Sequence, residues 1–306
     1  MGFRHMAGGG TAALVAAVVG LSGCSPQASQ PAPQDEGPVV VASTTQTADF
    51  AQQVLGDRGK VVGLLQPNQS PHHHEVTPAD VTNIAQADVV VHGGAGLTDA
   101  WLPQAVASAG FQGIQADAAA GAKLRKRVKD GKVEDDPHIW HDPDNAKVMT
   151  RNIAQAVEQQ DPANKDFYER NASAYLAKLD ELEQQTRRAL DSIPADQRKI
   201  VTTHGAFGYY CDHYGVEFAG SVIPSFDDQA EQSSKQIDDF VRTLQESKVK
   251  AIFTEATIPA DVVRAVGEQA HVKIVSDPLY SDNNGPGLDY IATETHNADV
   301  IVSNLR

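Results

Sequence analysis

Residues 161–194 read DPANKDFYERNASAYLAKLDELEQQTRRALDSIP, and this stretch predicts one long helix in the middle of the chain. Side chains suited to burial recur there at steps of three and four residues, which places them on one helical face. They are Tyr175, Leu179, Leu182, Thr186, Leu190 and Ile193. A proline cannot continue a helix, so Pro194 is expected to end it. We interpret the stretch as a helix that joins two compact bodies.

Short β-branched runs alternate with helical patterns on both sides of this helix. The runs before it are residues 39–43, 60–65, 87–94 and 111–116, and those after it are residues 198–204, 216–222, 249–255 and 272–277. Strands that alternate with helices predict parallel sheets covered by helices. Because 306 residues exceed what one hydrophobic core usually serves, we expect an α/β protein of two lobes, 38–160 and 195–306, joined by 161–194. The charged residues 117–137 are interpreted as an exposed loop.

The N-terminus has the pattern of a bacterial lipoprotein. A short basic start and the apolar run TAALVAAVVG precede LSGC at 21–24, which resembles a lipobox. We expect residues 1–23 to be a signal peptide, Cys24 to be lipid-modified, and residues 24–37 to form a flexible tether. The only other cysteine is Cys211, so no disulfide within the folded part is expected.

The net charge of −15 argues against one class of partner. An acidic surface repels phosphate backbones, so nucleic acid is not expected to bind. The same charge suits attraction of cations, although it also serves solubility alone.

Several candidate metal ligands follow strands of the predicted sheets. His72, His73 and His74 come after the strand that ends at residue 65, and His204 directly follows the first strand of the second lobe. Asp282 follows the last strand, and His138 closes the charged loop. Ligands bind at the carboxyl ends of parallel strands, so these side chains are expected to converge. All three consecutive histidines cannot easily reach one ion, and at least two of them suit a solvated loop.

At this point the motifs resemble a known family, the cluster A-I solute-binding proteins of bacterial ABC importers, which capture zinc or manganese. The resemblance runs from about residue 38 to the C-terminus. The segments that carry it are PHHHEVTPAD (71–80), DPHIWHDP (136–143), THGAFGYY (203–210) and LYSDNNG (279–285), with GSVIPSFDDQAEQS (220–233) and FTEATIP (253–259) as similar connecting segments. The family fold implied is two α/β lobes joined by one long rigid helix, which should limit closure to small movements.

The resemblance implies a binding site rather than an active site. It assigns His72, His138, His204 and Asp282 as metal ligands. Beside the resemblance, His141, Glu255 and His74 are further candidates, as weak ligands or as neighbours of the ligands. Three imidazoles and a carboxylate suit Zn²⁺, with Mn²⁺ as the alternative cargo. Partners implied are a membrane permease and its cytoplasmic ATPase, and the receptor is expected to be a monomer anchored outside the cell membrane by its lipid.

Two departures and two other functions stay open. His141 stands where the family usually has an apolar residue, and residues 117–136 lack the histidines that zinc members often carry there. An adhesin-type surface lipoprotein is one alternative. A zinc hydrolase is the other, but a fourth protein ligand would fill the position that catalytic zinc keeps for water, and the chain has no HExxH motif. We therefore expect no enzyme.

Overall fold

The computed structural model describes residues 37–129, 132–247 and 249–306, so the predicted signal peptide, Cys24 and nearly all of the tether lie outside the described residues. The first half of the chain contains β1 (Val39–Ala42), α1 (Thr45–Leu55), β2 (Lys60–Gly63), α2 (Pro78–Ala85), β3 (Val89–His92), α3 (Leu102–Ser108), β4 (Ile114–Asp117), β5 (Lys126–Lys129), β6 (Lys132–Asp135) and α4 (Pro143–Gln160). The second half contains α5 (Lys165–Asp191), β7 (Lys199–Thr202), α6 (Gly208–Tyr214), β8 (Glu217–Ser221), α7 (Ser234–Ser247), β9 (Ala251–Glu255), α8 (Ala260–Ala270), β10 (Lys273–Leu279) and α9 (Tyr290–Leu305).

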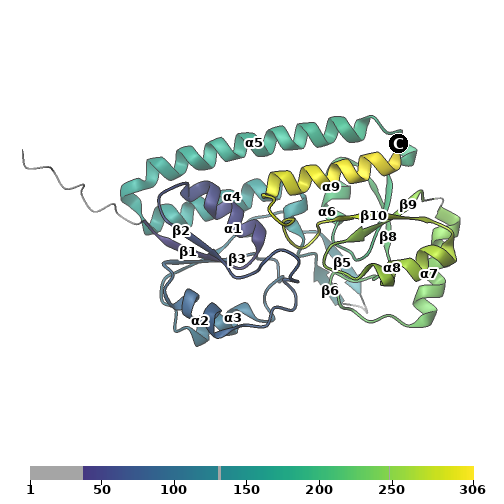
Figure 1. The fold of residues 1–306 in the computed structure, drawn as a ribbon. Coiled ribbons are helices and arrows are strands. Elements are labelled where there is room, and N and C mark those ends of the chain that lie inside the picture. The colour runs from purple at the N-terminus through teal and green to yellow at the C-terminus, as the bar shows by residue number, and fades with distance from the viewer. Residues whose placement is uncertain (1–36, 130–131, 248) are drawn as a thin grey trace, which may run out of the picture. The chain divides into compact units, whose positions relative to one another are not determined.

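Two parallel sheets form the frame, as the sequence predicted. The first has the order β2-β1-β3-β4 and the second the order β10-β9-β7-β8. Side chains alternate between the faces of a strand, so β1 sends Val40 and Ala42 to one core and Val41 to another. Helices cover both faces of each sheet, with α2 and α3 below the first sheet in Figure 1 and α1 and α4 above it.

The long helix α5 contributes to the cores of both sheets. Tyr175, Leu179 and Leu182 pack in the core of the first sheet, whereas Leu190 packs in the core of the second. Figure 1 shows α5 running past both sheets. The helix ends at Asp191, before the predicted Ile193, because a residue that precedes proline is pushed out of helical geometry. Ile193 is buried in the second core nevertheless.

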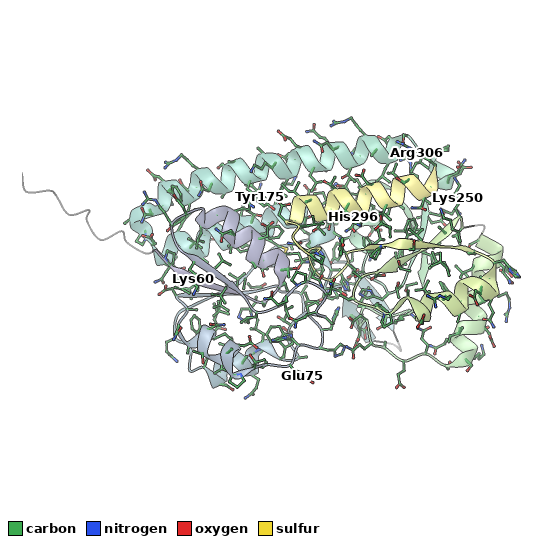
Figure 2. The ribbon with its side chains drawn as sticks, in the orientation of Figure 1. Lys60, Glu75, Tyr175, Lys250, His296 and Arg306 are labelled. Atoms are coloured by element: carbon green, nitrogen blue, oxygen red, sulfur yellow. The ribbon has the colours of Figure 1, made fainter. Side chains whose placement is uncertain are left out.

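A second helix, α9, also connects the two halves, and the sequence pattern alone did not identify it. At its start, the Tyr290 amide donates to Asp49 Oδ2 of α1 at 3.0 Å and the Tyr290 hydroxyl donates to the Trp140 carbonyl at 2.6 Å. At its end, Arg306 Nη2 donates to Ser192 Oγ at 2.8 Å. Tyr175, His296 and Arg306 in Figure 2 mark where α5 and α9 run side by side.

The charged segment 117–137 is not the exposed loop that the sequence predicted. Its second part contains the antiparallel pair β5–β6, in which Lys126 pairs with Asp135. The Asp136 amide donates to the Arg125 carbonyl at 2.9 Å, and Arg125 Nη1 contacts Asp136 Oδ2 at 2.8 Å. The sequence between the two strands contains Asp130-Gly131, a dipeptide that favours hairpins.

Among the described residues, no helix is both long and apolar enough to cross a membrane.

Candidate metal centre

Four predicted ligands from four loops meet at one point. His72 lies between β2 and α2, His138 follows β6, His204 follows β7, and Asp282 follows β10. One ligand atom of each lies within 4.8 Å of those of the other three. His138, His204 and Asp282 are fully buried, and the side chain of His72 is 10% exposed. The carboxyl ends of parallel strands place His204 and Asp282 here as expected, whereas His138 follows a strand of the antiparallel pair β5–β6.

The distances between the four ligand atoms suit one small cation. Asp282 Oδ1 lies 3.7 Å from His72 Nε2, 3.3 Å from His138 Nε2 and 3.5 Å from His204 Nε2. The His138 and His204 Nε2 atoms are 3.3 Å apart. In a tetrahedral zinc site with bonds of roughly 2.0–2.1 Å, ligand atoms lie about 3.3–3.4 Å from one another. Among the described residues, His72 Nε2 and Asp282 Oδ1 have no hydrogen-bond partner although both are buried.

Acidic side chains hold two of the imidazoles from behind. Asp136 Oδ1 lies 2.9 Å from His138 Nδ1 and accepts from the His138 amide at 3.1 Å. Glu255, at the end of β9, contacts His204 Nδ1 at 2.5 Å and accepts from the His204 amide at 2.8 Å. A carboxylate that accepts from Nδ1 fixes the orientation of the ring and leaves Nε2 free to face a metal ion. Asp136 was missed from the sequence, although it stands two residues before His138 in the quoted motif.

The pocket favours positive charge. Burial lowers the pKa of His138, but its contacts with the carboxylates of Asp136 and Asp282 outweigh this, and the pKa lies above its ordinary value. Burial likewise lowers the pKa of His204, yet the charges of Glu255 and Asp282 raise it well above the usual range. Burial raises the pKa of Asp282, but the neighbouring histidines, His204 first, outweigh this and hold the pKa well below its ordinary value. The carboxylates therefore stabilise a proton or a divalent cation in the same place.

Three other candidate residues lie around the cluster, not in it. Glu255 contacts His204 as described. His141 uses both ring nitrogens elsewhere, with Nδ1 2.9 Å from Glu294 Oε1 and Nε2 3.0 Å from the Ser281 carbonyl. His74 Nε2 lies 3.1 Å from Asp80 Oδ2, so this ring is used at the start of α2. Of the three consecutive histidines, only His72 reaches the cluster.

The loop that carries Asp282 is tied to the first half of the chain. The Asn68 amide donates to Asn283 Oδ1 at 3.0 Å, and the Asn284 amide donates to Thr45 Oγ1 at 2.7 Å. Trp140 Nε1 donates to the Ser281 carbonyl at 3.1 Å. From the second half, Thr257 Oγ1 donates to Asp282 Oδ2 at 3.3 Å. The asparagines fix this loop next to His72 and His138.

Comparison with known proteins identifies the family. The model of the family described as zinc-uptake complex component A, periplasmic (ZnuA), matches residues 40–304. The chain belongs to this family. Its members are substrate-binding receptors, so the expectation that the chain is not an enzyme is confirmed, as is the resemblance itself.

Named members of this family and its structural relatives carry different metals in their names. The chain is 30% identical over 278 residues to the manganese ABC transporter substrate-binding lipoprotein PsaA of Streptococcus pneumoniae, covering 89% of this chain and 88% of that one. It is 29% identical to the iron ABC transporter substrate-binding lipoprotein MtsA of Streptococcus pyogenes serotype M1, covering 93% and 94%. The periplasmic zinc-binding protein TroA of Treponema pallidum has a similar structure, with TM-score 0.81 and 25% identity over 88% of this chain and 99% of TroA.

Proposed function

We propose that this ZnuA-family protein is the extracytoplasmic receptor of an ABC importer and that Zn²⁺ is the ion it captures. The observation that carries the choice of ion is the donor set of three imidazole nitrogens and one carboxylate oxygen. Asp282 Oδ1 lies 3.3–3.7 Å from the three nitrogens, and the His138 and His204 Nε2 atoms are 3.3 Å apart. Zn²⁺ prefers such nitrogen-rich tetrahedral sites, whereas Mn²⁺ prefers more oxygen ligands. The family name and the name of TroA support zinc.

The proposed mechanism is capture and delivery. His72, His138, His204 and ionised Asp282 bind the ion between the two sheets, and the loaded protein docks on a membrane permease that a cytoplasmic ATPase drives. The relatives named as lipoproteins support a position outside the cytoplasm, held to the membrane through Cys24. Because protons compete for the same nitrogens, acidification should release the ion.

The test needs more than an affinity. Zn²⁺ binds most nitrogen sites more tightly than Mn²⁺, so tighter binding of zinc would be expected even of a manganese receptor. We would therefore measure accumulation of radioactive zinc and manganese in cells that lack the receptor and in the same cells with the gene restored. Elemental analysis of protein purified without added metal accompanies this. Restored zinc uptake with zinc in the purified protein supports the proposal.

Manganese is the other candidate, and the name of PsaA is the observation that favours it. Restored manganese uptake with unchanged zinc uptake would replace zinc by manganese in the proposal. Uptake of both metals that does not depend on the receptor would instead favour the adhesin-type surface lipoprotein.

A further inference from the structure

A second group of metal-binding side chains lies beside the candidate centre. His73, Asp227 and Asp228 each offer one ligand atom within 4.8 Å of the others. His73 Nε2 lies 2.7 Å from Asp227 Oδ1 and 3.7 Å from Asp228 Oδ1. His73 comes from the loop before α2, and both aspartates come from the loop between β8 and α7. The group therefore bridges the two halves of the chain, as the inner four side chains do.

Asp228 carries the argument that this group has an ionic ligand. Its residue is only 5% exposed, and among the described residues its Oδ1 atom has no hydrogen-bond partner. A buried carboxylate oxygen without a partner is costly, because it has lost water and gained nothing in exchange. His73 Nε2 lies 3.7 Å from this oxygen. That gap is too long for a hydrogen bond, but a cation can sit in contact with both atoms.

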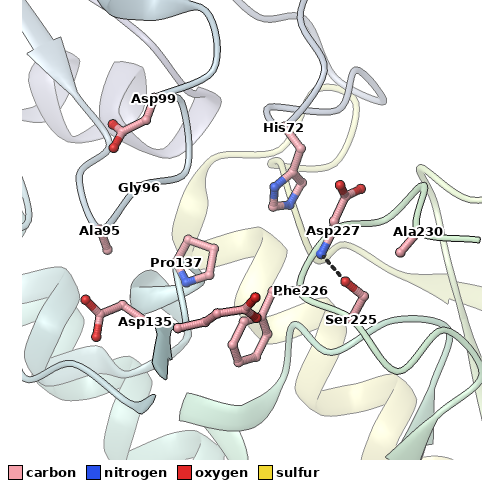
Figure 3. A pocket seen from close by; sticks show the side chains of 11 residues that line it. His72, Ala95, Gly96, Asp99, Asp135, Pro137, Ser225, Phe226, Asp227 and Ala230 are labelled. Carbon is pink, nitrogen blue, oxygen red and sulfur yellow. Dashed lines mark hydrogen bonds between the residues drawn. The ribbon is translucent and has the colours of Figure 1, made fainter. Parts of the chain in front are cut away.

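One member of the group, Asp227, lines the open pocket that reaches the inner side chains at His72. His72 and Asp227 line the same open pocket of about 620 Å³, as Figure 3 shows. Acidic residues are prominent in that lining, which also includes Asp99, Glu134 and Asp135. His72 is the one ligand of the inner cluster with an exposed edge, and its ring centroid lies 6.3 Å from that of His73. A negative pocket raises the local concentration of cations.

We propose that His73 Nε2, Asp227 Oδ1 and Asp228 Oδ1 form a second, weaker divalent-cation site that holds the incoming ion before it passes to His72 and the inner cluster. The inference rests on the proposed function. The site is weaker because it offers three protein ligands and because His73 and Asp227 are 38% and 48% exposed, so water completes the coordination. Neighbouring imidazoles at 72 and 73 allow the ion to change partners without returning to bulk solvent.

The test counts zinc equivalents bound by the full-length protein. Equilibrium dialysis against Zn²⁺ should give one tight and one weak equivalent for the wild type. The variants His73→Ala, Asp227→Asn and Asp228→Asn should keep the tight equivalent and lose the weak one. His92→Ala and Asp57→Asn are matched controls, because they remove the same groups outside this pocket, and both should keep two equivalents.

The rate of loading is the second readout. Trp140 packs against His138 with ring centroids 5.5 Å apart, so its fluorescence should report filling of the inner cluster. With zinc below one equivalent, His73→Ala and Asp227→Asn should load about tenfold more slowly than the controls. Both side chains are exposed, so these variants should fold normally.

The outcomes separate this inference from the proposed function. A wild type that binds a single zinc equivalent, or variants that keep the weak equivalent and load at the control rate, would overturn the outer site alone. A wild type that binds no zinc would overturn the zinc receptor and the outer site together. Unchanged stoichiometry with a simple loss of stability would mean that His73 and Asp227 form only a surface ion pair.

Discussion

At the scale of single residues, the three neighbouring imidazoles face different partners, and of the three it is His72 that joins the cluster of candidate ligands. His73 turns to Asp227 and His74 to Asp80, which leaves His72 beside Asp282. The resemblance predicts that His72 is the metal ligand of the three, and a comparison of zinc affinities between variants at 72 and 73 tests this prediction directly.

Removal of a ligand should weaken the tight zinc site far more than removal of its neighbour. We expect His72→Ala, His138→Ala and His204→Ala each to lower zinc affinity by more than about 100-fold, because each removes a nitrogen that would contact the ion. His73→Ala should leave the tight affinity within a few-fold of the wild type. Competition with a zinc chelator measures both. Equal losses at His72 and His73 would refute the register.

The carboxylates behind the imidazoles should matter less than the ligands but still measurably. Asp136→Asn and Glu255→Gln keep the shape of each side chain but remove the charge that holds His138 or His204. We expect zinc affinity to fall about 10–100-fold, with one tight equivalent retained. Glu217→Gln is the control, because Glu217 is exposed and pairs with Lys199 far from the cluster. An unchanged affinity in both variants would mean that packing alone orients the rings.

At the scale of elements, His213 fastens α6 to the start of α4 and to the middle of α5. Its Nδ1 atom lies 3.0 Å from Asp142 Oδ1, and its Nε2 atom lies 3.1 Å from Glu183 Oε1. Burial lowers the pKa of His213, but the two carboxylates outweigh this and the pKa lies above its ordinary value. Arg187 Nη2 also lies 3.1 Å from His213 Nε2, and it donates a hydrogen bond to Glu183 Oε1 at 3.0 Å.

This contact predicts a pH-dependent difference in stability. The folded protein binds the His213 proton more tightly than the unfolded chain, so the stabilisation is complete below about pH 6.5 and is lost as pH rises through the folded pKa. We expect His213→Ala to lower the melting temperature of chelator-treated protein more at about pH 5.5 than at about pH 8.5. His271→Ala, at an exposed position, should show no such trend. A penalty that grows with pH would contradict the assignment.

The elements also show where sequence reasoning succeeds and fails. Strand-helix alternation and the stripe on α5 are local patterns, and they predicted both sheets and the helix that serves both cores. The prediction of an exposed loop at residues 117–137 was wrong because it rested on the charge of the segment, whereas β5 and β6 pair there. Among the candidate site residues, His72, His204 and Asp282 follow strands of the predicted parallel sheets, which made their convergence predictable. His138 was expected at the end of a charged loop and instead follows β6. The partners Glu294 and Asn283 depend on tertiary contacts that no local pattern encodes, whereas Asp136 lies two residues from His138 and was within reach of the sequence.

At the scale of the whole molecule, attachment to the membrane remains a prediction, because Cys24 lies outside the described residues. We expect Cys24→Ala to move the protein from the membrane fraction to the soluble extracytoplasmic fraction, since the lipid would have no point of attachment. Fractionation followed by immunoblotting measures this. Cys211→Ala is the matched control and should stay with the membrane, as Cys211 is a buried core residue. A Cys24→Ala variant that stays bound would indicate another anchor.

The way in which the Asp282 loop is fastened has a consequence for unloading. Asn283 and Asn284 hydrogen-bond that loop to Asn68 and Thr45, so Asp282 is held from the first half as well as by its own strand β10. Of the three histidines in the cluster, His204 is the one that follows a strand of the second sheet, where Glu255 holds it. In the proposed receptor, a small separation of the halves would therefore move His204 away from His72 and His138 first. The transporter would then need to break only the bond between His204 and the ion to begin the release of the ion.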